Sequence, residues 1–200
     1  MKSLTLDDLL PLAEFAGRRR ELSAMHARYR DRYRRVAVGP AATLLFENRQ
    51  TLWFRVQEVL RVARLSEPDR VQEELDLYNR LLPGRNRLQA ALLIRIHNEA
   101  DFAAELAPWQ RLEGDQLRLH LGVAEYPASL YTCRPEDRCL GTAHWVQFVL
   151  DGTGRRLLLD YRQPAYVRIS LPGYRHESAP LGEEVRQSLA EDLSLSDDDP

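Results

Sequence analysis

Two features are scarce in this chain of 200 residues, namely cysteine and long uninterrupted apolar stretches. Cys133 and Cys139 are the only cysteines, and the five residues between them do not match the spacing of common zinc and thiol-redox motifs. No run of about 18 uncharged apolar residues occurs, so we expect no membrane span. Asp7, Asp8 and Pro11 interrupt the first apolar run before it could act as a secretory signal. We therefore predict a cytoplasmic protein with two free thiols.

Lysine is nearly absent, because 27 of the 28 basic side chains are arginine, so arginine abundance by itself is weak evidence for anion binding. The net charge of -2 argues against a protein that binds nucleic acid with its whole surface. The charge is nevertheless uneven, since residues 1–96 carry a net +6 and residues 97–200 a net -8. The cationic first half is therefore the half expected to meet an acidic partner.

Motifs of high specificity are missing too. The chain has no phosphate-loop lysine motif, no dinucleotide-binding glycine fingerprint and no nucleophile elbow. None of the histidines has the spacing found in di-iron bundles or zinc proteases. The histidines are His26, His97, His120, His144 and His176. We therefore predict no cofactor and no metal ligand set, and we expect the histidines to be structural.

Hydrophobic spacing predicts helices in the first half of the chain and mainly strands in the second. A stripe from Phe15 through Met25 to Tyr33 predicts a long first helix. Two more helices are predicted at residues 51–65 and from Ser66 to Leu82, with Asn48 or Thr51 capping the first and Ser66 the second. Strands are predicted at residues 42–47, 88–96, 116–123, 144–150, 155–161 and 165–171, with a short helix ended by Pro108 and a last helix at 180–193.

These patterns predict an α+β fold in which N-terminal helices pack on a mainly antiparallel β-sheet, followed by a C-terminal helix. No internal repeat, linker or domain boundary is evident, so residues 1–193 are expected to form a single domain. Residues 194–200, with the sequence SLSDDDP, are expected to be a disordered acidic tail.

Polar residues gather where the strand at residues 42–47 meets the next helix. Glu47 ends the strand, Glu58 lies on the helix, and Glu74 lies on the helix after it. If the two helices pack side by side, Glu58 and Glu74 could approach each other and perform acid-base work or bind a metal. The alternative is an exposed row of ion pairs with no function. Phe54, on the polar side of the helix, favours a covered face on which charges must be paired.

The segment 18–35 contains eight arginines, with Tyr29 and Tyr33 between them. Arginine with aromatic residues is typical of single-stranded nucleic-acid surfaces, but these tyrosines continue the apolar stripe and are expected in the core. The remaining cationic face suits an acidic protein partner as well as RNA. The arginines assigned to this face are Arg18, Arg19, Arg20, Arg28, Arg32 and Arg35.

Two sequence blocks resemble domain-of-unknown-function family 3501, a bacterial family. The blocks are VAVGPAATLLFENRQTLWFRVQEVLR and VQEELDLYNRLLP, and weaker similarity continues to the last helix. Members are often encoded beside rubrerythrin and cysteine-rich iron-sulfur proteins, so the resemblance implies peroxide defence or thiol-redox electron transfer. It supplies no catalytic assignment, and Gln163 stands where relatives commonly have histidine. The carried positions, which we treat as a candidate polar pocket, are Glu47, Asn48, Arg49, Gln57, Glu58, Arg61, Glu74, Tyr78, Asn79 and His144.

The functional hypothesis from sequence is an accessory protein that docks onto an acidic iron or iron-sulfur redox partner such as rubrerythrin. One alternative is a metal-binding or acid-base enzyme that uses Glu47, Glu58, Glu74, Tyr78 and His144. The other is RNA binding through the arginine-rich helix, although nucleic acid is not the favoured partner. Whether the protein is an enzyme and whether it forms a homodimer are left open.

Overall fold

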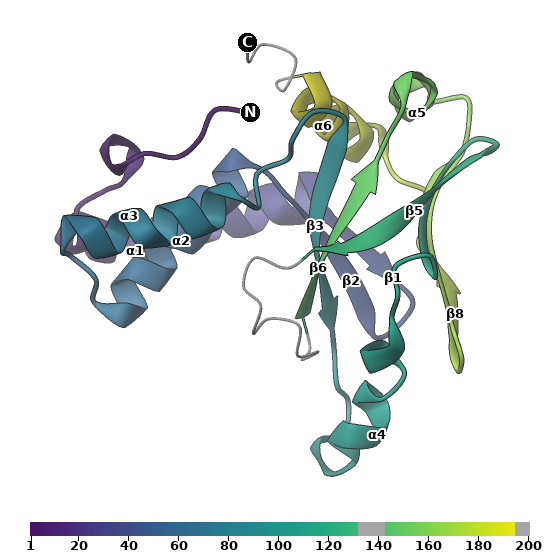
Figure 1. The fold of residues 1–200 in the computed structure, drawn as a ribbon, viewed down its shortest axis with the longest axis horizontal. Helices are drawn as coiled ribbons and strands as arrows, with labels where there is room; N and C mark the ends of the chain where they lie inside the picture. Colours follow the sequence, from purple (N-terminus) through teal and green to yellow (C-terminus); the bar gives the residue numbers. More distant parts are fainter. Residues whose placement is uncertain (132–142, 195–200) are drawn as a thin grey trace.

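The computed structural model describes residues 1–131 and 143–194, and it confirms the predicted α+β fold (Figure 1). Cys133, Cys139 and the acidic tail from residue 195 onward lie outside these residues. The helices are α1 (Leu12–Tyr33), α2 (Arg49–Ala63), α3 (Pro68–Asn79), α4 (Phe102–Leu106), α5 (Gly152–Leu159) and α6 (Glu183–Ser194), with 3-10 turns η1 (Leu6–Asp8), η2 (Glu99–Asp101) and η3 (Trp109–Arg111). The strands are β1 (Arg35–Val38), β2 (Ala42–Glu47), β3 (Arg87–Ile94), β4 (Leu117–Leu121), β5 (Ala124–Tyr131), β6 (Ala143–Val149), β7 (Ala165–Leu171) and β8 (Tyr174–Glu177).

The strands form one antiparallel sheet in the order β1-β2-β3-β6-β5-β4-β7-β8, which curls until its two edges approach each other. Val38 at the end of β1 forms an isolated bridge with Ser178, just after β8. The Tyr174 hydroxyl accepts hydrogen bonds from the backbone N–H groups of Ala41 and Ala42 and donates to the Val38 carbonyl. The sheet is therefore nearly barrel-shaped, and these contacts satisfy polar groups that an open edge would expose.

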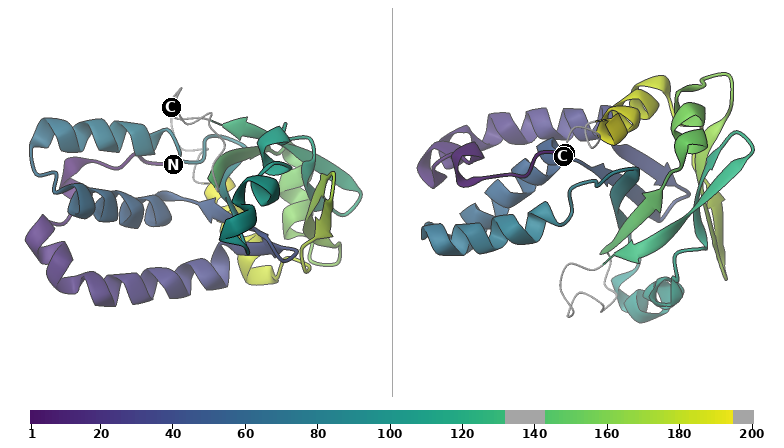
Figure 2. Two further views of the ribbon diagram at one scale, coloured as in Figure 1. Left: turned by 90° about the horizontal axis from the view of Figure 1, so that it is seen from below. Right: turned by 45° about the horizontal axis from the view of Figure 1, so that its top comes forward.

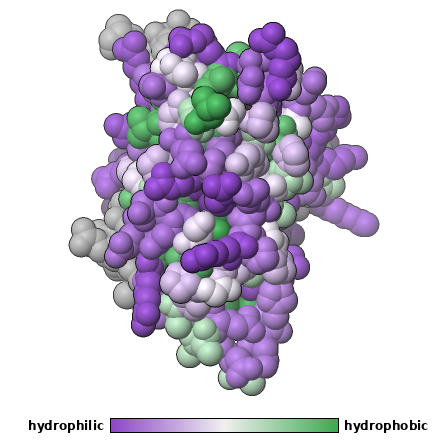
Figure 3. Space-filling view, turned by 90° about the vertical axis from the view of Figure 1, so that its right-hand side faces the viewer, coloured by the Kyte–Doolittle hydropathy of each residue, from purple (hydrophilic) through white to green (hydrophobic). Residues whose placement is uncertain are grey.

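Alternation along the strands places one set of apolar side chains inside this barrel. Phe46 on β2 and Phe148 on β6 meet there with ring centroids 6.2 Å apart. Leu189 and Leu193 of α6 belong to the same core. The outward side of β4, β7 and β8 is largely hydrophilic (Figure 3), with ion pairs such as Arg168 to Glu177. The barrel interior is thus a packed core.

The N-terminal helices form a second layer outside the barrel, with α2 between α1 and α3 (Figure 2). The predicted stripe of Leu52, Val56 and Leu60 on α2 is buried in a core shared with Leu75 of α3 and with Leu4. On the other side of α2, Phe54 packs edge-on against Phe15 of α1, their centroids 5.9 Å apart. Both flanks of α2 are therefore covered, as Phe54 suggested.

Several local predictions were wrong. Residues 155–161 were expected to form a strand, but most of them belong to α5, because the Asp151 side chain accepts a hydrogen bond from the Gly154 N–H and caps a helix there. Met25 is 52% exposed and is no part of a core. Ser66 does not cap α3, which starts after Glu67 without a side-chain cap. Strands β5 and β8 were not anticipated.

None of the helices in residues 1–131 and 143–194 combines the length and the apolar character that a membrane crossing requires.

Candidate functional site

Glu47 lies at the end of β2 with a side chain that is fully buried. Arg55, one and a half turns into the next helix region on α2, donates from Nη2 to Glu47 Oε1 at 2.6 Å. The same guanidinium lies 5.0 Å from the ring centroid of Trp145 on β6, a cation–π arrangement. Glu47 Oε2 has no hydrogen-bond partner among the described residues. The carboxylate is therefore paired on one oxygen and unsatisfied on the other.

Further polar groups surround this carboxylate without completing its hydrogen bonding. Gln89 is the register partner of Glu47 on β3, and its Oε1 accepts a bond from Gln147 at 3.1 Å, but its Nε2 is buried without a partner in the described part of the chain. His26 of α1 stacks on Phe54 at 4.2 Å. Burial, together with the nearby charges of Arg30 and Arg55, lowers the pKa of His26 to about 4. The surroundings of Glu47 are therefore cationic and poorly hydrated.

Asn48, the next residue, caps α2 and points to a different set of partners. Its side chain accepts a bond from the Thr51 N–H at 3.1 Å, and the Thr51 hydroxyl accepts one from the Asn48 N–H at 2.8 Å, which confirms the predicted cap. Asn48 Nδ2 also donates to the Tyr29 hydroxyl of α1 at 2.9 Å. The cap therefore ties the start of α2 to α1.

The Tyr29 hydroxyl belongs to a buried network that the sequence did not reveal. Arg34, which follows α1 and is 2% exposed, donates to this hydroxyl from Nε at 3.1 Å and from Nη2 at 2.9 Å. It also pairs through Nη1 and Nη2 with the two carboxylate oxygens of Asp192 on α6, itself 2% exposed. A single network therefore joins the end of α1, the β2–α2 junction and α6.

Burial opposes the charge of Arg34, but the Asp192 carboxylate and the Tyr29 hydroxyl outweigh it and raise the pKa of Arg34. Burial raises the pKa of Asp192, and the Arg34 guanidinium and the Asn48 amide offset part of that rise. Each charge is thus tolerated in a water-poor site only because the other is present.

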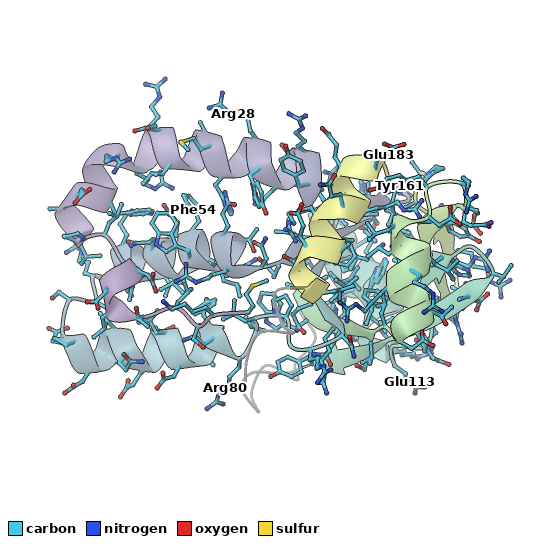
Figure 4. The ribbon with its side chains drawn as sticks, turned by 90° about the horizontal axis from the view of Figure 1, so that it is seen from above. Arg28, Phe54, Arg80, Glu113, Tyr161 and Glu183 are labelled. Atoms are coloured by element: carbon cyan, nitrogen blue, oxygen red, sulfur yellow. The ribbon has the colours of Figure 1, made fainter. Side chains whose placement is uncertain are left out.

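A cleft of about 510 Å³ opens beside this network, between α1 and α6. Its lining residues are Tyr29, Tyr33, Gln50, Glu184, Gln187, Ser188 and Glu191. Figure 4 shows α6 lying across the end of α1, above the barrel. The buried network therefore forms the floor of a solvent-accessible hollow.

The structure places the predicted carboxylates on different flanks of α2. Glu58 faces α1, where it pairs with Arg19 at 2.8 Å and with Arg61 at 2.9 Å. Partial burial works against the Glu58 charge, but these two arginines outweigh it and lower its pKa. Glu74 and Tyr78 belong to α3, on the other flank of α2. Glu58 therefore takes part in an α1–α2 ion-pair network.

Three other predicted residues hold the N-terminal segment in place. Asn79 donates to the Leu4 carbonyl at 2.9 Å and accepts from the Leu4 N–H at 2.8 Å, as a neighbouring strand would. Arg49 pairs with Asp8 at 2.7 Å. The buried Gln57 donates to a backbone carbonyl of the same segment, that of residue 10, at 3.4 Å. These contacts give Arg49, Gln57 and Asn79 a structural task.

His144 lies on the opposite face of the sheet from Glu47. It is the register partner of Leu92 on β6 and β3, and Leu92 points into the barrel core, whereas Glu47 pairs with Gln89 on the outer face. Burial lowers the pKa of His144, and its Nε2 finds no partner among the residues that the structure describes. Because strand neighbours alternate between faces, Glu47 and His144 point to opposite sides of the sheet.

Four of the six arginines assigned to a partner face are paired within the chain. Arg18 pairs with Glu14, Arg19 with Glu58, Arg32 with Glu184, and Arg35 with Asp31. Within residues 1–131 and 143–194, no carboxylate pairs with the remaining two, Arg20 and Arg28. Figure 4 shows Arg28 projecting away from the helical layer.

In the described part of the chain, no group of three or more His, Cys, Asp or Glu side chains could hold a metal ion. The functional centre that sequence reasoning missed is the set Tyr29, Arg34 and Asp192. Its only sequence signal is the position of Asp192 within the buried stripe of α6, next to Leu193 and three residues after Leu189.

Comparison with known proteins gives a family and a close fold. No curated protein matches the chain. The structure resembles the crystal structure of a novel protein of unknown function from Burkholderia pseudomallei, with a TM-score of 0.87 and 30% sequence identity over 96% of this chain and 100% of that chain. The sequence matches the family described as "Protein of unknown function (DUF3501)" over residues 3–193. The chain therefore belongs to the DUF3501 family.

Proposed function

We propose that this protein is an accessory protein that docks, through the outer face of α1, onto an acidic surface of an iron or iron-sulfur redox protein. The observation that carries the proposal is the pair of exposed cations Arg20 and Arg28 on α1, for which the described residues supply no carboxylate. Met25 lies three residues before Arg28 and is 52% exposed. Unpaired arginine beside exposed methionine is typical of protein interfaces.

Charge complementarity supports an acidic partner over a neutral one. The paired arginines of α1 are already neutralised by the chain's own carboxylates, so Arg20 and Arg28 would give an added ligand its strongest attraction. The redox class of the partner rests on the family resemblance, whose members are often encoded beside rubrerythrin. Rubrerythrin is accordingly the first partner to test.

The test is co-purification with rubrerythrin and with an iron-sulfur protein at low and high salt. We expect association at low salt that is lost at high salt, because exposed charges are screened. The double variant Arg20→Glu/Arg28→Glu should lose association, whereas Arg111→Glu/Arg175→Glu, with the same change of charge on the barrel, should retain it. No association at low salt, or full association of the α1 variant, would contradict the proposal. Single-stranded RNA in the same assay tests the nucleic-acid alternative, which predicts a steep loss of affinity with salt.

A second candidate function is suggested by Glu47 alone. Its buried Oε2 lacks a partner among the described residues, and an unsatisfied buried carboxylate is typical of sites that hold a proton or a cation. We propose, as the alternative, acid-base or metal chemistry at Glu47. Metal analysis of tag-free protein tests the metal version: near-stoichiometric iron, zinc or manganese that is lost in Glu47→Gln would support it, and substoichiometric metal in the unaltered chain would count against it.

A further inference from the structure

We infer that the cleft between α1 and α6 binds a small aliphatic amine, such as a diamine or polyamine. The volume of the cleft, about 510 Å³, lies within the range of small-molecule sites. Its walls come from three elements: the last turns of α1, the first turn of α2 and the length of α6. The site lies apart from Arg20 and Arg28, so the inference is independent of the docking proposal.

The charge of the lining favours a cation. Glu184 and Glu191 are the ionised groups among the lining residues, and no arginine or lysine lines the cleft. Glu184 is paired with Arg32 at the rim, but Glu191 contacts only an amide, accepting from Gln187 Nε2 at 3.2 Å. The Arg34 charge beneath the floor is neutralised by Asp192. The hollow therefore carries an uncompensated negative charge.

Two aromatic rings add to this preference. Tyr29 and Tyr33 lie with ring centroids 5.4 Å apart on the α1 wall. The chain itself places guanidinium groups against these rings, Arg34 at 5.5 Å from Tyr29 and Arg32 at 5.2 Å from Tyr33. Rings that attract the protein's own cations also attract an ammonium group. Tyr29 is held by three N–H donors from Arg34 and Asn48, so this wall is fixed before a ligand arrives.

An independent observation comes from Ser188. Its side chain lines the cleft, the residue is only 7% exposed, and its hydroxyl forms no hydrogen bond to any residue that the structure describes. A buried hydroxyl without a partner is uncommon, because its hydrogen-bonding capacity is lost on folding. An ammonium group in the cleft would donate to Ser188 Oγ and to the Glu191 carboxylate together.

The inference is tested by titrating putrescine and spermidine into the full chain at low salt, with calorimetry as the readout. We expect saturable binding, weakened about tenfold in Glu191→Gln by loss of one charge-assisted contact. Ser188→Ala should weaken binding by a smaller factor. Glu183→Gln is the matched control, because Glu183 is on the same helix, is exposed and does not line the cleft (Figure 4).

Absence of saturable binding for both amines would overturn the inference. An equal loss in Glu183→Gln and Glu191→Gln would also overturn it, because it would indicate nonspecific attraction to the acidic helix. The docking variant Arg20→Glu/Arg28→Glu should still bind the amine, so failure of one proposal is distinguishable from failure of the other. Circular dichroism of each variant establishes that it is folded.

Discussion

At the scale of single residues, the surroundings of Glu47 determine how His26 responds to pH. His26 stacks on Phe54, and its pKa of about 4 in the folded chain is well below its ordinary value of 6.5. Between these two values the unfolded chain binds a proton that the folded chain does not. The free energy of unfolding therefore falls as pH drops from 6.5 toward 4.

The first prediction is that His26→Phe reduces this pH dependence. Phenylalanine keeps an aromatic ring against Phe54 and removes the titrating group. Urea unfolding at pH about 7 and about 5 should show a smaller loss of stability in the variant than in the unaltered chain. The same loss in both proteins would show that His26 is protonated equally well in the folded and unfolded states.

The two buried polar centres differ in how far they could be predicted. Glu47 and Asn48 stand next to a clear strand and a clear helix, and the covering of α2 was indicated by Phe54. Arg34 and Asp192 are separated by 158 residues, and each sits among many residues of the same charge. Local spacing cannot identify such a partner, because only the tertiary fold brings α6 against the end of α1.

At the scale of elements, regular spacing predicted α2 and α3 because each buries a continuous apolar stripe. The failure at α5 has an equally local cause. Three successive leucines, at residues 157–159, fit a short strand as well as a helix, and the capping role of Asp151 decides between them. Strand β5 was missed because most of its residues alternate without strong apolar character.

The second prediction concerns the attachment of the N-terminal segment. Asn79→Ala removes both hydrogen bonds to the Leu4 backbone, at a cost of about 1–3 kcal/mol. Hydrogen exchange in residues 2–10 should accelerate, while exchange in the barrel should stay unchanged. Gln72→Ala on the exposed side of α3 is the control and should leave the segment protected. Unchanged exchange in Asn79→Ala would mean that the segment is held by other contacts.

At the scale of the whole molecule, two apolar cores lie on the two sides of one sheet. The barrel core contains Phe46 and Phe148, and the helical core includes Trp145 and Tyr131 packed from the outer face of the same strands. Because β6 contributes side chains to both cores, neither core can lose its packing without disturbing the other. This arrangement supports the expectation of a single domain.

The third prediction is therefore one cooperative unfolding transition. Tryptophan fluorescence reports both cores, since Trp109 lies in the barrel core and Trp53 packs on the helical core. Fluorescence and circular dichroism should give the same denaturation midpoint. Two separate midpoints would instead indicate that the helical layer and the barrel unfold as independent domains.

The central claim is that the buried pair Arg34–Asp192 holds α6 against α1 and so forms the floor of the cleft. A double-mutant cycle with Arg34→Met, Asp192→Leu and the combined variant, measured by urea unfolding, tests it most directly. We predict that each single change costs about 3–5 kcal/mol, because it leaves an unpaired buried charge, and that the combined variant loses no more than either. Single losses below about 1 kcal/mol that simply add in the combined variant would contradict the claim.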